Sequence, residues 1–267
     1  MKDKYILLAI RNLAIVLLLI VVYIIADRYF ANRRYKKKEE YWADEYYKQT
    51  ALAYDVVRLN PPIKAEYKAY KALAEYLKAK GENYKFRFLI NPLFILGDVY
   101  SEADLILLCP AGIIVYEIKN YQDTVIASNN KYWEHHIGNQ TFKFYSPYQQ
   151  NETHIRILKE YIRTKTCNVS FGNRLNYIVH NIVVFASETE RRSHMTNIKF
   201  DKSCSDNVKN AIFNLQNIKK TVELFGDGAL SDKEIDELYK QLFHTTVYIP
   251  EQREKQIEYA KQQGYDD

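Results

Sequence analysis

Residues 104–119 read DLILLCPAGIIVYEIK and carry the strongest structural signal in the chain. Two apolar runs flank Pro110-Ala111-Gly112, and proline and glycine at these places are typical of a turn. Both runs are apolar on both faces, which favours strands that are covered on two sides. The sequence therefore predicts a β-hairpin in the interior of a sheet.

The length of the turn decides which polar residues of this hairpin meet. If Pro110 and Ala111 are its two central residues, Cys109 pairs with Gly112. Asp104 then lies opposite Glu117, with Cβ atoms roughly 5 Å apart. Lys119 lies on the same face as Glu117 because side chains alternate along a strand. A turn one residue longer would shift this register.

Two facing carboxylates in a buried sheet repel each other and are costly to desolvate. Lys119 can neutralise one charge, and Mg²⁺ or Mn²⁺ would bridge both acids through oxygen ligands. Such a site suits hydrolysis of a phosphodiester, with Lys119 orienting a water or stabilising developing charge. The alternative is a structural ion pair at a strand end, since the triplet Glu-x-Lys also occurs at Glu66–Lys68.

Outward from the hairpin, strands and helices alternate, which predicts an α/β domain with a mixed sheet. The stripe Ile63, Tyr67, Tyr70, Leu73 and Leu77 has helical spacing. The other predicted elements are an extended stretch at 85–96, short strands within 125–145, a helix from Ser146-Pro147 to about Arg163, a strand at 177–187, helices at 206–225 and 231–243, and a polar tail at 250–267.

The amino-terminal segment 5–26 is apolar apart from Arg11 and Asn12. Its 22 residues are enough to cross about 30 Å of hydrocarbon, so we expect a transmembrane anchor. The rival is a cleaved signal peptide, but no small-x-small cleavage site follows the apolar run. The larger basic cluster follows the span, at Arg28 and 33–38, which predicts a cell-membrane protein with its soluble part in the cytoplasm.

Composition limits the remaining classes. The net charge of +5 permits a nucleic-acid partner without requiring one. The three cysteines, Cys109, Cys167 and Cys204, fit neither a disulfide framework nor a paired-ligand zinc site. Only 8 glycines and 6 prolines in 267 residues argue against a disordered chain. One domain with appendages is expected.

Together, Asp104 with its apolar strand, Ala111-Gly112, IIVYEIKNY (113–121), Trp133 and SPYQQNETHIRIL (146–158) resemble the nuclease-related domain, NERD. That family is assigned to the PD-(D/E)xK, restriction-endonuclease-like superfamily, and the resemblance covers about 63–190. It implies a restriction-endonuclease-like mixed β-sheet flanked by helices. It also implies that Asp104, Glu117 and Lys119 are the catalytic acid, acid and lysine, and that Gln150 is the glutamine of the following helix.

The resemblance raises further candidates and two departures. Family members tend to carry a glutamate on the first helix, for which Glu66 is the candidate and Glu82 the alternative. His154 follows Gln150 by four residues and either lines the same site or is a packed histidine. Gln149 is expected to complete a capping box with Ser146. Gln122-Asp123 stands where the family commonly has glycine, and Ser146-Pro147 where it commonly has Asn-Pro.

These observations predict a membrane-anchored, metal-dependent nuclease that acts on DNA, with Asp104 and Glu117 as ligands of Mg²⁺ or Mn²⁺. The alternatives are a catalytically silent module of the same fold tethered to the membrane, and a membrane-organising protein that works through its stalk. The expected organisation is an anchor at 1–27, a basic and aromatic helical stalk at 28–62 ended by Pro61-Pro62, a nuclease-like core at 63–190, a helical extension at 191–250 and a polar tail at 251–267.

Overall fold

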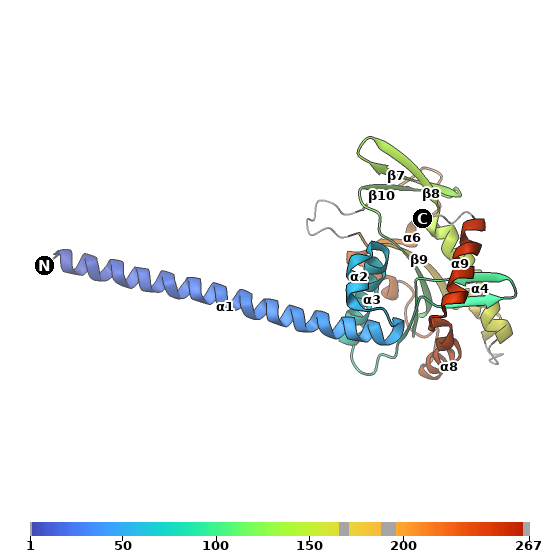
Figure 1. Ribbon diagram of the computed structural model, residues 1–267, viewed down its shortest axis with the longest axis horizontal. Helices are drawn as coiled ribbons and strands as arrows, with labels where there is room; N and C mark the ends of the chain where they lie inside the picture. The colour runs from blue at the N-terminus through green and yellow to red at the C-terminus, as the bar shows by residue number, and fades with distance from the viewer. Residues whose placement is uncertain (1, 166–170, 188–195, 264–267) are drawn as a thin grey trace. The chain divides into compact units, whose positions relative to one another are not determined.

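The computed structural model describes residues 2–165, 171–187 and 196–263. Within these ranges the side chains of residues 2–15, Tyr54 and Gln263 are not described. The chain divides into a first unit, Met1–Glu45, and a compact second unit, Tyr46–Asp267. The second unit is a mixed α/β domain with several sheets and flanking helices, which confirms the predicted α/β class with a mixed sheet (Figure 1).

The first unit belongs to helix α1 (Lys2–Thr50), which is continuous through the predicted anchor and stalk. Apolar side chains from Val16 to Ile25 are exposed around it. In the described part of the chain, however, no helix has an apolar stretch that would reach across a bilayer. The predicted span at 5–26 begins outside the described side chains and is not confirmed.

The prediction that Pro61-Pro62 ends the stalk helix was wrong. Helix α1 ends at Thr50, where Ala51 takes a positive φ of 57°. The short helix α2 (Tyr54–Leu59) follows, and the two prolines open α3 (Pro61–Ala79). Proline suits the first turn of a helix because the amide N–H it lacks would have no helical partner there. The Asn60 side chain caps α3 by accepting from Ile63 N at 3.3 Å.

The main sheet has the strand order β1-β4-β5-β9-β11. Its strands are β1 (Arg87–Ile90), β4 (Leu105–Cys109), β5 (Gly112–Lys119), β9 (Val179–Phe185) and β11 (Ile212–Asn214). Strands β4 and β5 form the predicted hairpin, and Cys109 pairs with Gly112 as expected from a two-residue turn. Every residue of both strands is buried, as their apolar sequences predicted.

Gly112 is required by this hairpin for two reasons. Its φ of +120° lies in a region that other residues rarely adopt. A Cβ atom there would also lie 2.4 Å from the carbonyl oxygen of Ile178, so no side chain fits between β5 and the segment before β9. Gly112 of this turn therefore also allows the close approach of the segment before β9 to β5.

Helices cover the main sheet on both faces, with β9 and its neighbours between α3 and α4 (Figure 1). Helix α4 (Pro147–Lys165) buries Ile155 and Leu158 against Val115 on one face of β5. Helix α8 (Asp232–Leu242) joins the same core and begins at a complete Ser231–Glu234 capping box. Because side chains alternate along β5, Glu117 and Lys119 share the α4 face with Val115.

Two smaller sheets flank the main one. Strands β2 (Leu93–Leu96) and β3 (Val99–Glu102) form a hairpin, and β10-β6-β7-β8 form a four-stranded sheet. The latter consists of β10 (Asn197–Phe200), β6 (Thr124–Ala127), β7 (Tyr132–Ile137) and β8 (Gln140–Tyr145). Trp133 packs in a second core with Val183 and Phe185 of the main sheet. The predicted strands within 85–96 and 125–145 are confirmed.

One prediction about the carboxy-terminal part was wrong, and the segment predicted to be polar at 250–267 is largely helical. The expected helix at 206–225 is instead α6 (Asp206–Asn210), β11, the 3₁₀ turn Leu215–Asn217 and α7 (Lys220–Glu223). Strand β11 forms because it pairs in parallel with β9 at the sheet edge. The residues expected to be a polar tail form α9 (Pro250–Gln263), which contacts β3. Cys109 and Cys204 are buried free thiols, and Cys167 lies outside the described residues.

Candidate active site

The predicted residues Asp104, Glu117 and Lys119 come together where the β4–β5 hairpin ends. Asp104 lies just before β4, and its carboxylate accepts a hydrogen bond from the backbone N–H of Ile118 at 2.6 Å. This bond holds the acid against β5. Glu117 and Lys119 project from the α4 face of β5, with Lys119 Nζ 3.2 Å from Glu117 Oε1. The hairpin register therefore places two acids and one amine in a single cluster.

The electrostatics of Asp104 reflect this crowding. Burial raises the pKa of Asp104 well above its usual value, and the neighbouring charge of Glu117 raises it further. Lys119 and the Ile118 N–H act in the opposite direction, because both favour the ionised carboxylate. The net upward shift means that the positive groups present do not offset the cost of burying these acids.

Glu66 brings a third carboxylate from α3. Its Oε2 accepts a hydrogen bond from Asn91 Nδ2 at 3.0 Å. Burial and then the charge of Asp104 raise the pKa of Glu66 well above its usual value. The alternative candidate, Glu82, is exposed in the turn after α3 and does not line the pocket. Of the two glutamates considered, the structure brings only Glu66 to the cluster.

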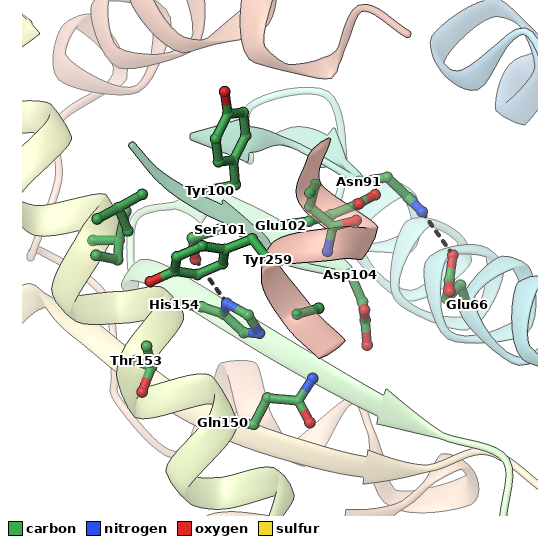
Figure 2. Close-up of a pocket in the computed structure, with 14 residues that line it drawn as sticks. Glu66, Asn91, Tyr100, Ser101, Glu102, Asp104, Gln150, Thr153, His154 and Tyr259 are labelled. Atoms are coloured by element: carbon green, nitrogen blue, oxygen red, sulfur yellow. Dashed lines mark hydrogen bonds between the residues drawn. The ribbon is translucent and has the colours of Figure 1, made fainter. Parts of the chain in front are cut away.

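These groups border a pocket of about 250 Å³. Figure 2 shows Asp104, Gln150 and His154 at this pocket, with Gln150 and His154 extending from α4. Glu117 and Lys119 lie deeper, with 1% and 7% of their surfaces exposed. The pocket thus reaches the cluster from the side of Asp104 and α4.

His154 contacts the cluster directly. Its Nε2 lies 3.6 Å from Glu117 Oε2, and its Nδ1 shares a hydrogen bond of 2.8 Å with Ser101 Oγ. Burial lowers the pKa of His154 to about 4, and Lys119 contributes in the same direction. The ring is therefore neutral at neutral pH, and its contact with Glu117 is not an ion pair.

Several pocket residues have no motif that would have revealed them. Asn91, Ser101 and Glu102 come from the segment around the β2–β3 hairpin, and Gln256 and Tyr259 come from α9. Asn91 has a positive φ of 49°, and the following Pro92 was the one local signal of an irregular backbone there. Their positions depend on long-range packing.

The two departures from the family pattern have local explanations. Asp123 adopts a φ of 62°, the left-handed conformation that glycine takes most easily. Ser146 Oγ accepts from Gln149 N at 3.3 Å, so it caps α4. The reciprocal half of the predicted capping box is not formed, because Gln149 Nε2 donates instead to the Asn129 carbonyl at 3.1 Å.

No group of three or more histidine, cysteine or acidic side chains in the described part of the chain is arranged closely enough to hold a metal ion by itself. The donors at the pocket that suit a hard cation are the carboxylates of Asp104 and Glu117, with Glu66 beside them. Mg²⁺ is commonly held by one or two carboxylates, with waters and substrate oxygens completing its coordination. The residues present fit that kind of site.

A comparison with known protein families finds a match to part of the chain. Residues 63–186 match the family model described as the nuclease-related domain, NERD, whose general fold is that of the PD-(D/E)xK superfamily. The match spans α3 to the end of β9 and includes Glu66, Asp104, Glu117, Lys119 and Gln150. No curated protein and no solved structure matches the chain.

Proposed function

Because residues 63–186 form a nuclease-related domain, we propose that the chain is a metal-dependent nuclease that hydrolyses phosphodiester bonds in DNA. The observation that carries the proposal is the convergence of Asp104, Glu117 and Lys119 at the end of the β4–β5 hairpin, beside a pocket. The upward pKa shift of Asp104 supports it, since burial and then the charge of Glu117 raise that pKa more than Lys119 and the Ile118 N–H lower it.

A divalent cation would relieve this imbalance. Asp104 and Glu117 would hold Mg²⁺ or Mn²⁺, with the Glu66 carboxylate close enough to raise the local negative potential. When bound, the cation would lower the pKa of a water molecule and draw a phosphate oxygen into the site. The Ile118 N–H keeps Asp104 in place for this task.

The other side chains have roles that follow from their donors and positions. The Lys119 ammonium supplies a positive charge that can stabilise negative charge developing on the phosphate. The Gln150 amide lines the pocket and can donate a hydrogen bond to a phosphate oxygen. His154 acts as a positioning residue, because its Nε2 faces Glu117 while Ser101 holds its other nitrogen.

The direct test is cleavage of DNA by the full chain, kept in detergent because α1 exposes apolar side chains. We expect cleavage of double- or single-stranded DNA with Mg²⁺ or Mn²⁺ and none with EDTA. Calorimetry should detect binding of the same ions. Ion binding without cleavage of DNA or RNA would contradict the nuclease proposal. The absence of both would favour a silent module that keeps the buried Glu117–Lys119 pair for structural reasons.

Replacement of His154 should weaken cation binding. His154→Phe removes the nitrogen that faces Glu117, and loss of such a supporting contact typically costs about 10–100-fold in metal affinity or activity. His154→Gln keeps a polar group in place and should restore part of the loss. Calorimetry with Mn²⁺ measures the affinity, and thermal unfolding provides the control. Equal Mn²⁺ affinity in all three proteins would show that His154 is only a packed histidine.

We also propose that α1 attaches the domain to the membrane. The exposed apolar side chains 16–25 support this proposal, as do the basic residues that follow, Arg28, Arg33, Arg34 and Lys36–Lys38. The full chain should float with phosphatidylglycerol-containing vesicles in a density gradient. Replacing Leu17, Leu18 and Leu19 by glutamine should leave the protein at the bottom of the gradient. Flotation of that variant equal to the parent would refute the attachment.

A further inference from the structure

Helix α9 forms one wall of the candidate active site. Its residues Gln256, Tyr259 and Ala260 line the same pocket as Asp104 and Gln150. In Figure 2 the Tyr259 ring lies beside Ser101 and His154, and the ribbon of α9 passes across the pocket. Helix α9 lies outside the segment 63–186 that matches the family. It is therefore an addition that covers the domain's site rather than part of the matched domain.

A buried arginine holds α9 in this place. Arg253 is 8% exposed, and its Nη1 lies 2.5 Å from Glu102 Oε1. Its Nη2 donates to the Asn91 carbonyl at 2.6 Å. Asn91 in turn donates from its side chain to Glu66. One side chain of α9 thus connects the helix to β3 and to the loop that positions a site carboxylate.

Two pockets border this part of α9. A second cavity of about 380 Å³ lies along α9 and is lined by Thr50, Ile63, Tyr248, Arg253 and Ile257. Gln256 borders both cavities. Most of the residues of α9 are polar, and its Ile257 is half exposed. These pockets leave parts of α9 without packing partners, so fewer contacts are lost when the helix moves.

We propose that α9 is an autoinhibitory cover of the active site and that Arg253 is the latch that holds it closed. The inference rests on the proposed nuclease function. With α9 in place, Gln256, Tyr259 and Ala260 border the pocket of about 250 Å³ that leads to Asp104, so the helix narrows the approach of a polynucleotide to that residue. Displacement of α9 admits the phosphate. The population of the open state then limits the rate of cleavage.

The experiment breaks the ion pair between Arg253 and Glu102 by changing either partner, and it measures how accessible the pocket becomes. Arg253→Ala and Glu102→Gln each break the ion pair, so the second variant serves if the first unfolds. Lys255→Ala, an exposed cation on the same helix, is the matched control. Each change is made in the full chain carrying Thr153→Cys, a pocket position next to α9. The rate at which maleimide labels position 153 is read by peptide mass spectrometry, alongside the rate of DNA cleavage with Mg²⁺.

We expect both latch variants to be labelled and to cleave DNA about tenfold faster, which corresponds to about 1.4 kcal/mol in the closed-to-open equilibrium. Lys255→Ala should match the parent in both measurements. Unchanged labelling in both latch variants would overturn the proposal. Faster labelling with slower cleavage would also overturn it, because α9 would then build the site. If no protein cleaves DNA, the nuclease function and the inhibition both fail, while labelling still reports whether α9 opens.

Discussion

Asp104→Asn is expected to reduce DNA cleavage by about 10²–10³-fold, the loss that follows removal of one charge-stabilising group from an active site. Asparagine keeps the size of the side chain and an oxygen that can accept from the Ile118 N–H. It removes the negative charge that would hold the cation with Glu117. The fold should therefore persist while the chemistry is lost. Initial rates with a plasmid or fluorescent DNA substrate measure the effect.

Glu152→Gln is the matched control for this change. Glu152 lies on α4 two residues after Gln150, is exposed, and does not line the pocket. The substitution Glu152→Gln removes one negative charge from the same helix region without changing Asp104, Glu117 or Lys119. Cleavage by Glu152→Gln should equal that of the parent. If Asp104→Asn retained full activity with Mg²⁺, Asp104 would not be a ligand, and the nuclease proposal would lose its main support.

Asp104→Asn should also stabilise the protein when divalent ions are removed. Asp104 and Glu66 each have a folded-state pKa raised by burial and then by a neighbouring carboxylate. An acid with a raised folded pKa favours the folded state at low pH. That contribution is lost as the pH rises from the unfolded value, about 4, through the raised folded value. In EDTA, the free energy of unfolding should therefore fall with rising pH across this window.

Asp104→Asn should flatten this pH dependence and raise the stability at pH 7. It removes one titrating acid and also one of the charges that raises the pKa of Glu66. A gain in the free energy of unfolding is expected, because an acid whose folded-state pKa is raised destabilises the folded protein at neutral pH. Urea unfolding in EDTA at several pH values measures it. Lower stability of the variant at neutral pH would show that the acids are not held together under strain.

Divalent ions should reverse the order of stability. A ligand that binds only the folded state, at 100 times its dissociation constant, stabilises by about 2.7 kcal/mol. Adding Mn²⁺ should therefore stabilise the parent much more than Asp104→Asn. The opposite signs of the two effects separate a functional acid from a structural one. A structural acid would lose stability on replacement with or without the ion.

The sequence by itself determined the hairpin and the acids it carries. Pro110-Ala111-Gly112 predicted a turn, and with Pro110 and Ala111 as its central residues the pairing of Cys109 with Gly112 and the meeting of Asp104 with Glu117 followed from the alternation of side chains. The α4 and α8 helices were equally readable, since Ser146 and Ser231 mark their starts. These features are local, because the residues whose pattern predicts the turn or the helix start are the same residues that form it.

Only the tertiary structure decided the rest of the site. The segment 206–225 reads as a helix, but Ile212–Asn214 pairs with the edge of β9, and the sheet overrides the local preference. The polar carboxy-terminal segment has no apolar stripe, yet α9 docks through the ion pair of Arg253 with Glu102. His154 reaches Glu117 because α4 packs across β5. Each of these contacts joins residues far apart in the chain, so its energy exists only once the sheet has formed and has no counterpart in local sequence pattern.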